Sequence, residues 1–293
     1  MGRSRDHRVS GTTRGGCGRA NAADRRGGPV DAAEAEKQVG RRFTWPWFLV
    51  AVLVYLGIIQ GLGQLIGVDT SSSDSRFPTT ESLVRNALIP IGASIVFVAA
   101  LVTWLGWGGE VLRYRVPVRR WVRWVPVSML LGSLVAMNYG HLGDQSGSLV
   151  VCLLLLGLFV GVGEELMFRG VGVHVFKRAG FSEGKVALWS SVIFGLAHVS
   201  NAIGQGAQAI IQALVVCTSG YFFYLCLRVG GVILLPMLVH GLWDTSLFSS
   251  MIGAEPVVYP GAVLLVVLQV ALIVVLVRRR RTVSPTRTPT SPA

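Results

Sequence analysis

Repeated apolar stretches of about 20 residues are the feature that most limits what this chain can fold into. A helix rises ~1.5 Å per residue, so a stretch of this length crosses the ~30 Å hydrocarbon core of a bilayer. The 293-residue chain is 52% hydrophobic and only 14% charged, a balance far from that of a soluble domain. The sequence therefore predicts a membrane protein.

Eight such stretches are predicted to span the membrane. They are continuous apolar runs without an alternation of period two, which favours helices over a β-barrel, since backbone groups in lipid must pair with one another. The predicted fold is all-α, a polytopic membrane helical bundle of about eight transmembrane helices. The approximate spans are residues 47–68, 87–107, 125–140, 148–168, 186–203, 207–227, 232–251 and 257–277.

The net charge of +12 is distributed according to these spans. Arg and Lys gather in every second loop, and the intervening loops carry most of the acidic residues, the alternation expected if the basic loops are cytoplasmic. Both termini are then expected in the cytoplasm, and the expected location is the plasma membrane of a bacterium. The Arg clusters adjoin spans and lack interleaved aromatic residues, so no nucleic-acid partner is expected.

Three regions follow from composition. Residues 1–40 are rich in Gly, Arg and Ala and are predicted to form a disordered cytoplasmic tail. Residues 41–281 form the predicted transmembrane helical domain, and residues 282–293, with repeated Thr, Ser and Pro, form a second flexible tail. Four cysteines fit neither a metal-binding spacing nor a disulfide framework.

Ionisable side chains inside the predicted spans are few, and therefore informative. A charged side chain in hydrocarbon costs a few kcal/mol or more, so each is expected to face the bundle interior or a hydrated cavity and to have a partner. Their occurrence on three helices predicts one shared site. They are Glu164 and Glu165 in the fourth span, His198 in the fifth, and His240 and Asp244 in the seventh.

Helical spacing predicts which of these side chains pair. Glu165 and Arg169 are four residues apart and can form an ion pair on one helix face. His240 and Asp244 have the same spacing, so Asp244 is expected to reach one nitrogen of His240 and fix its tautomer. Glu164 is rotated by about 100° from Glu165, which leaves it free to point elsewhere.

These residue types suit hydrolysis. A carboxylate such as Glu164 in a partly dry cavity, with His198 to share or relay the proton, could deprotonate a water molecule that then acts as the nucleophile. The second polar pair, His240 with Asp244, could stabilise the oxyanion formed when water attacks a carbonyl. His141 and His174 fall at or beyond span ends, are expected to be solvated, and receive no role.

Three motifs in order resemble those of a known family. Glu164, Glu165 and Arg169 form EExxxR, Phe194 to His198 reads FxxxH, and His240 to Asp244 reads HxxxN/D. The pattern is similar to that of the CAAX prenyl protease and bacteriocin-processing (CPBP, Abi) family of intramembrane endopeptidases. The resemblance covers about residues 150–250, and three motifs on separate predicted helices are far more specific than any one alone.

The resemblance implies hydrolysis of peptide bonds in membrane-associated or lipidated peptides or proteins. Glu164 would be the general base acting with His198, and Glu165 and Arg169 would support the site. His240 and residue 244 would form the oxyanion site, but this chain has Asp at 244 where many members have Asn. An ionised carboxylate repels an oxyanion, so Asp244 donates only if protonated, and orienting His240 is the favoured role.

A metal mechanism is the competing description of this family. Glu164, His198 and His240 could supply three zinc ligands with water in the fourth position. The sequence has no HExxH and the EExxxR motif has no histidine, so no cofactor is expected.

Two other classes of function stay open. A catalytically inactive membrane scaffold or immunity protein is the first alternative. A proton-coupled transporter is less favoured, because no internal repeat is visible. The expected partners are a membrane-anchored or lipidated peptide or protein substrate and the lipid bilayer; the sequence does not name the substrate.

Overall fold

The computed structural model describes residues 43–284, apart from the side chains of residues 204 and 205. The predicted tail at 1–40 and most of the predicted tail at 282–293 lie outside the described residues. Helices make up nearly all of the regular structure described, and strand pairing is limited to two isolated bridges, Phe77 with Ile252 and Arg113 with Val232. The predicted all-α fold is confirmed.

Within residues 43–284, five helical segments have the length and hydropathy needed to cross a membrane. Two of them contain π-helical turns, named η1 and η3. The five are α2 (Trp45–Ile66); α3 (Thr80–Leu83), η1 (Val84–Leu88) and α4 (Ile89–Leu105); α8 (Gly147–Glu165), η3 (Leu166–Gly172) and α9 (Val173–Arg178); α12 (Gln208–Gly230); and α14 (Gly261–Arg279) with η5 (Arg280–Thr282).

The other three predicted spans correspond to shorter helices, so the count of about eight is not confirmed. They are α6 (Trp124–Ala136), α10 (Glu183–Ala197) and α13 (Leu234–Phe248), with 13, 15 and 15 residues. Each apolar run continues past its helix: α6 ends where Met137 turns extended, and α10 gives way to the 3₁₀ turn η4 (His198–Asn201) and then α11 (Ala202–Gln205). The remaining short helices are α5 (Gly108–Val111), η2 (Arg120–Arg123) and α7 (Tyr139–Gly143).

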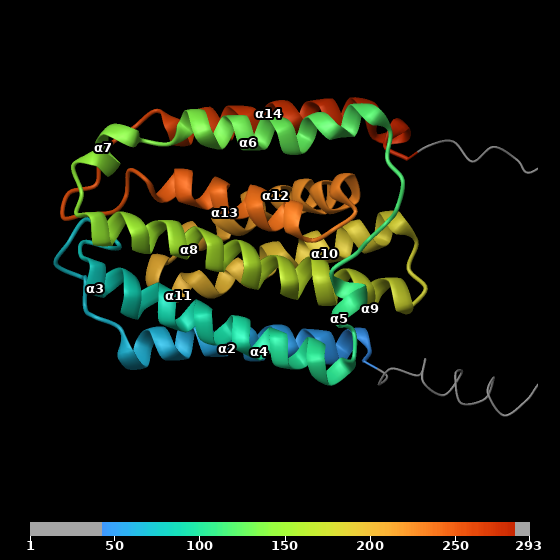
Figure 1. Ribbon diagram of the computed structural model, residues 1–293, viewed down its shortest axis with the longest axis horizontal. Helices are drawn as coiled ribbons and strands as arrows, with labels where there is room; N and C mark the ends of the chain where they lie inside the picture. Colours follow the sequence, from blue (N-terminus) through green and yellow to red (C-terminus); the bar gives the residue numbers. More distant parts are fainter. Residues whose placement is uncertain (1–42, 285–293) are drawn as a thin grey trace, which may run out of the picture. The chain divides into compact units, whose positions relative to one another are not determined.

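The longer helices run roughly alongside one another (Figure 1). Helices α6 and α14 pack together at one edge, α2 and α4 at the opposite edge, and α8, α10, α12 and α13 lie between them. The three motifs of the sequence analysis lie on α8, α10 and α13 of this central group and on the turns η3 and η4 that continue α8 and α10.

Glycines let α8 and α13 approach closely at the centre of the bundle. A Cβ atom placed on Gly241 of α13 would lie 2.6 Å from the carbonyl oxygen of Gly157 on α8. A Cβ on Gly161 would lie 3.0 Å from the amide nitrogen of Gly241. Small residues of this kind allow helix backbones to pack at short range in membranes. The crossing lies just before Glu164 on α8 and beside His240 on α13, so it sets the distance between the two.

Replacement of Gly241 by Ala is expected to lower stability by about 1–3 kcal/mol, because the added methyl group meets the α8 backbone. Thermal unfolding in detergent micelles measures this change. Gly57→Ala is the matched control: nothing lies within 4 Å of a Cβ there, and alanine favours a helix by up to ~1 kcal/mol over glycine. Equal stability of Gly241→Ala and the parent protein would contradict the close crossing.

Glu183, the first residue of α10, anchors the helix that leads to His198. Its carboxylate accepts hydrogen bonds from Tyr114 Oη (2.9 Å), from Lys177 Nζ (3.0 Å) and from the Tyr224 hydroxyl. The carboxylate thus ties α10 to α9, α12 and the segment after α5.

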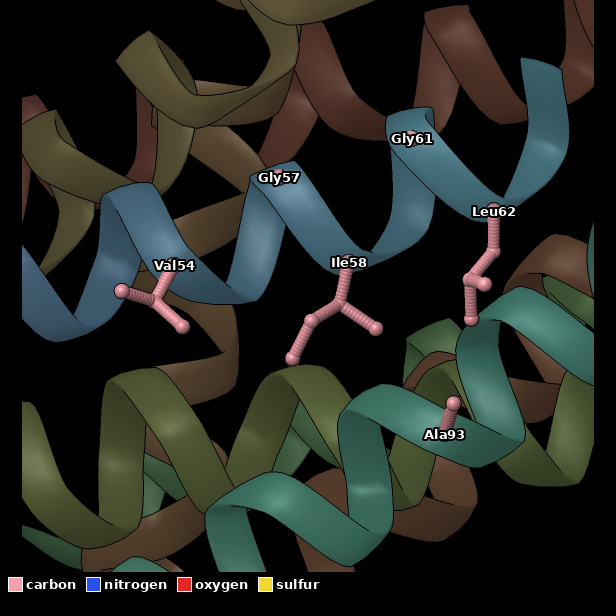
Figure 2. A pocket seen from close by; sticks show the side chains of 6 residues that line it. All are labelled: Val54, Gly57, Ile58, Gly61, Leu62 and Ala93. Carbon is pink, nitrogen blue, oxygen red and sulfur yellow. The ribbon is translucent and has the colours of Figure 1, made fainter. Parts of the chain in front are cut away.

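An apolar groove of about 660 Å³ lies between α2 and α4 (Figure 2). It carries no ionisable side chain, so it is separate from the polar cluster around Glu164. Its lining residues are Val54, Gly57, Ile58, Gly61, Leu62 and Ala93.

Candidate active site

The two carboxylates of the EExxxR motif lie at a change of helix type. Glu165 is the last residue of α8, and the π-helical segment η3 follows at once and carries Arg169. π-helical turns are uncommon and occur frequently at functional sites. The Glu165 side chain is fully buried, whereas that of Glu164 is 17% exposed. The two neighbours therefore have different environments, as their rotation about the helix predicts.

Glu164 faces both predicted histidines. Its Oε2 atom lies 4.0 Å from His198 Nε2 and 3.8 Å from His240 Nε2. Oε2 is buried and has no hydrogen-bond partner among the described residues. These distances exceed a direct hydrogen bond and match polar groups that one water molecule can bridge. The structure thus brings together the three side chains expected to carry out the chemistry.

Glu165 holds a buried network behind this face. Its Oε1 atom accepts a hydrogen bond from Arg169 Nη1 at 2.9 Å and lies 2.8 Å from His240 Nδ1. Arg169 Nη2 donates in turn to the carbonyl oxygen of Gly220 on α12, also at 2.9 Å. The predicted ion pair between Glu165 and Arg169 is present, with both side chains fully buried.

The role expected for Asp244 needs correction. Because Glu165 occupies His240 Nδ1, Glu165 and not Asp244 fixes the orientation of that ring. Asp244 Oδ2 lies 3.6 Å from His240 Nε2, the nitrogen that also faces Glu164. Spacing of four residues along α13 correctly placed Asp244 near the ring, but it could not reveal a competing carboxylate from another helix.

His198 is oriented by the backbone of its own helix. Its Nδ1 atom lies 3.0 Å from the carbonyl oxygen of Phe194, an acceptor, so we infer that Nδ1 carries the proton. The same reasoning assigns a proton to Nδ1 of His240 opposite Glu165. In both rings Nε2 is left for chemistry, and both Nε2 atoms point toward Glu164.

Two phenylalanines enclose the polar groups. The ring of Phe223 stacks on that of His240 with 4.2 Å between centroids, and Phe194 meets His198 edge-on at 5.1 Å. The Arg169 guanidinium lies 4.1 Å from the Phe194 centroid and 5.3 Å from that of Phe223. Phe194 was identified from the sequence only as the first residue of FxxxH, and Phe223 was missed, because α12 carries no motif that would single it out.

The donor atoms of Glu164, His198 and His240 are spaced more widely than the ligands of a bound zinc ion. Bond lengths of about 2.0–2.2 Å in a tetrahedral site put neighbouring ligand atoms ~3.4 Å apart, closer than the 3.8 and 4.0 Å found between Glu164 Oε2 and the two Nε2 atoms. Within residues 43–284, no group of three His, Cys, Asp or Glu side chains is arranged to hold a metal ion.

Comparison with known families adds independent support. Residues 145–246 match the family described as type II CAAX prenyl endopeptidase Rce1-like. This segment is an Rce1-like domain. It covers about a third of the chain, includes all six predicted site residues, and confirms the resemblance to the CAAX protease family. No curated protein and no solved structure matches the chain.

The Rce1-like domain also bears on location and chemistry. The matched family is one of membrane-embedded endopeptidases, and five helices within residues 43–284 have the length and hydropathy to span a bilayer. The helices and the family match together indicate an integral membrane protein, and the matched segment resembles a peptidase domain.

Proposed function

We propose that this protein is an intramembrane endopeptidase that hydrolyses peptide bonds of membrane-associated or lipidated peptides or proteins. The Rce1-like domain supports the reaction class. The observation that carries the proposal is the buried Oε2 atom of Glu164 facing Nε2 of His198 and of His240 at 4.0 and 3.8 Å.

Glu164 is the proposed general base. It accepts a proton from a water molecule held between its carboxylate and His198, and the water oxygen forms a bond to the carbonyl carbon of the substrate. Glu164 then returns the proton to the amide nitrogen as the C–N bond breaks, which releases an amine and a carboxylic acid. A positioned base of this kind contributes roughly 10²- to 10⁴-fold to a rate.

His240 is the proposed oxyanion donor. Its ring lies near three carboxylates, those of Glu164, Glu165 and Asp244. Only one of them, Glu165, is paired with a guanidinium, that of Arg169, so a positive charge on the ring offsets part of the remaining negative charge. Because Glu165 occupies Nδ1, a cationic His240 presents its second proton, on Nε2, to the oxyanion. Asp244, 3.6 Å from that Nε2, stabilises the cation and need not donate to the oxyanion itself.

The proposal also covers how the chain crosses the membrane. Helices α6, α10 and α13 pack against the longer helices and expose large apolar side chains, so we propose that they lie in the bilayer and that the chain has eight membrane-crossing segments. From the distribution of basic loops we infer that both termini lie in the cytoplasm, and the plasma membrane of a bacterium is the proposed location.

The test is cleavage by the purified protein in liposomes. Peptides anchored by a lipid chain or by one transmembrane helix are offered, and mass spectrometry identifies new termini. We expect cleavage to persist after exhaustive treatment with a zinc chelator. Activity that is lost on chelation and restored by added zinc would refute the metal-free mechanism, and binding of such peptides without cleavage would favour the scaffold alternative.

A further inference from the structure

Tyr55 is a buried residue of α2, outside the Rce1-like domain, with a hydroxyl group that packing does not explain. Its side chain is 1% exposed, and its ring meets that of Phe168 edge-on at 6.4 Å. The hydroxyl has no hydrogen-bond partner among the described residues. Phenylalanine would fill the same space without burying a polar group, so packing alone does not account for tyrosine here.

The Tyr55 hydroxyl points at the start of the EExxxR motif. A Cβ placed on Gly163 would lie 3.1 Å from this oxygen, so the glycine lets the hydroxyl reach the α8 backbone one residue before Glu164. Of the two neighbouring carboxylates, Glu165 is already held by Arg169 and His240, whereas Glu164 faces the histidines without a hydrogen bond. The hydroxyl of Ser94 on α4 donates to the carbonyl oxygen of Ile91 at 2.7 Å and forms no hydrogen bond with Tyr55.

Two buried oxygen atoms without partners therefore complement each other. The Tyr55 hydroxyl is a donor that lacks an acceptor, and Glu164 Oε2 is an acceptor that lacks a donor. A carboxylate in a dry environment is held in place chiefly by the donors that reach it. The histidines are too far from Glu164 Oε2 for direct hydrogen bonds.

We propose that Tyr55 is a positioning residue of the active site, whose hydroxyl donates through one water molecule to the Glu164 carboxylate and holds it toward His198 and His240. Helix α2 would thus complete a site that the Rce1-like domain supplies only in part. The catalytic consequence of this inference rests on the proposed function, whereas the hydrogen bond itself does not.

Tyr55→Phe is expected to lower kcat by roughly 10- to 100-fold, the loss that follows when a hydrogen bond to a charged group is removed. KM should stay within about twofold, because the ring and its contact with Phe168 are kept. Tyr221→Phe is the control: Tyr221 is a half-buried tyrosine of α12 whose ring stacks on Tyr224, and its variant should keep both constants. Unchanged kcat in Tyr55→Phe would overturn the proposal.

A measurement that needs no turnover separates this inference from the proposed function. Infrared difference spectra against Glu164→Gln identify the carboxylate stretch of Glu164. We expect this band to move in Tyr55→Phe, and to move in the opposite direction when 3,5-difluorotyrosine, a stronger donor, is inserted at position 55. The second substitution keeps the hydroxyl, so it also serves if Tyr55→Phe does not fold.

The outcomes are distinct. A Glu164 band that stays fixed in both variants would overturn the positioning role, even if the parent protein cleaves peptides. A band that moves in a parent protein without peptidase activity would support the positioning role and refute the proposed function.

Discussion

Glu164→Gln is expected to lower kcat/KM for an anchored peptide by about 10²- to 10⁴-fold, because an amide cannot accept the proton of the attacking water. The change is nearly isosteric and removes no short hydrogen bond between described residues, so the fold should be kept. Initial rates in liposomes, with unfolding temperature measured in parallel, test both expectations.

Glu81→Gln is the matched control for this variant. The Glu81 side chain is 65% exposed, and its Oε1 atom lies 2.8 Å from Arg85 Nη1. Glu81 is far in the sequence from Glu164 and the two histidines. Exposed pairs contribute ~1 kcal/mol or less, so its loss should change neither activity nor folding appreciably. If Glu164→Gln retained more than a tenth of the parent activity, Glu164 would not be the general base.

Arg169→Met is expected to produce the largest loss of stability among these variants. It leaves the Glu165 carboxylate buried without its cation, and removing one partner of a buried pair costs about 3–5 kcal/mol. Denaturant or thermal unfolding in micelles measures the loss. Glu81→Gln, which removes the negative charge of the exposed pair with Arg85, is the control and should cost no more than ~1 kcal/mol.

The double variant Glu165→Gln with Arg169→Met separates structure from catalysis. It leaves no charge of the pair uncompensated, so it should be more stable than Arg169→Met alone. Activity should nevertheless stay low, because His240 Nδ1 loses its anionic partner. A double variant with full activity would show that Glu165 serves the fold alone.

Interactions between close neighbours in the sequence could be predicted, and contacts between helices could not. Spacing of four residues on one helix predicted the pair of Glu165 and Arg169, which the structure contains. The contact of Glu165 with His240 joins α8 to α13, 75 residues apart, and depends on a crossing that no local pattern specifies. The expectation for Asp244 was wrong for this reason.

The limits of the helices were predictable only in part. The apolar run at 186–203 contains α10 and also the turn at His198, because hydropathy does not register a change of backbone conformation. Hydropathy also failed to show the surroundings of His141 and His174, which were expected to be solvated. His141 is 8% exposed and its Nε2 lies 2.8 Å from the carbonyl oxygen of Ile252, and His174 Nδ1 lies 2.7 Å from that of Gly170.

The surroundings of Arg169 bear on how such a protein is made. Its guanidinium contacts the Glu165 carboxylate on α8, a backbone carbonyl oxygen on α12, and aromatic rings on α10 and α12. His240, which contacts the same carboxylate, belongs to α13, late in the chain. A nascent polypeptide that has inserted only its first half lacks all of these groups. The buried network around Arg169 is therefore expected to be complete only after α13 has entered the membrane.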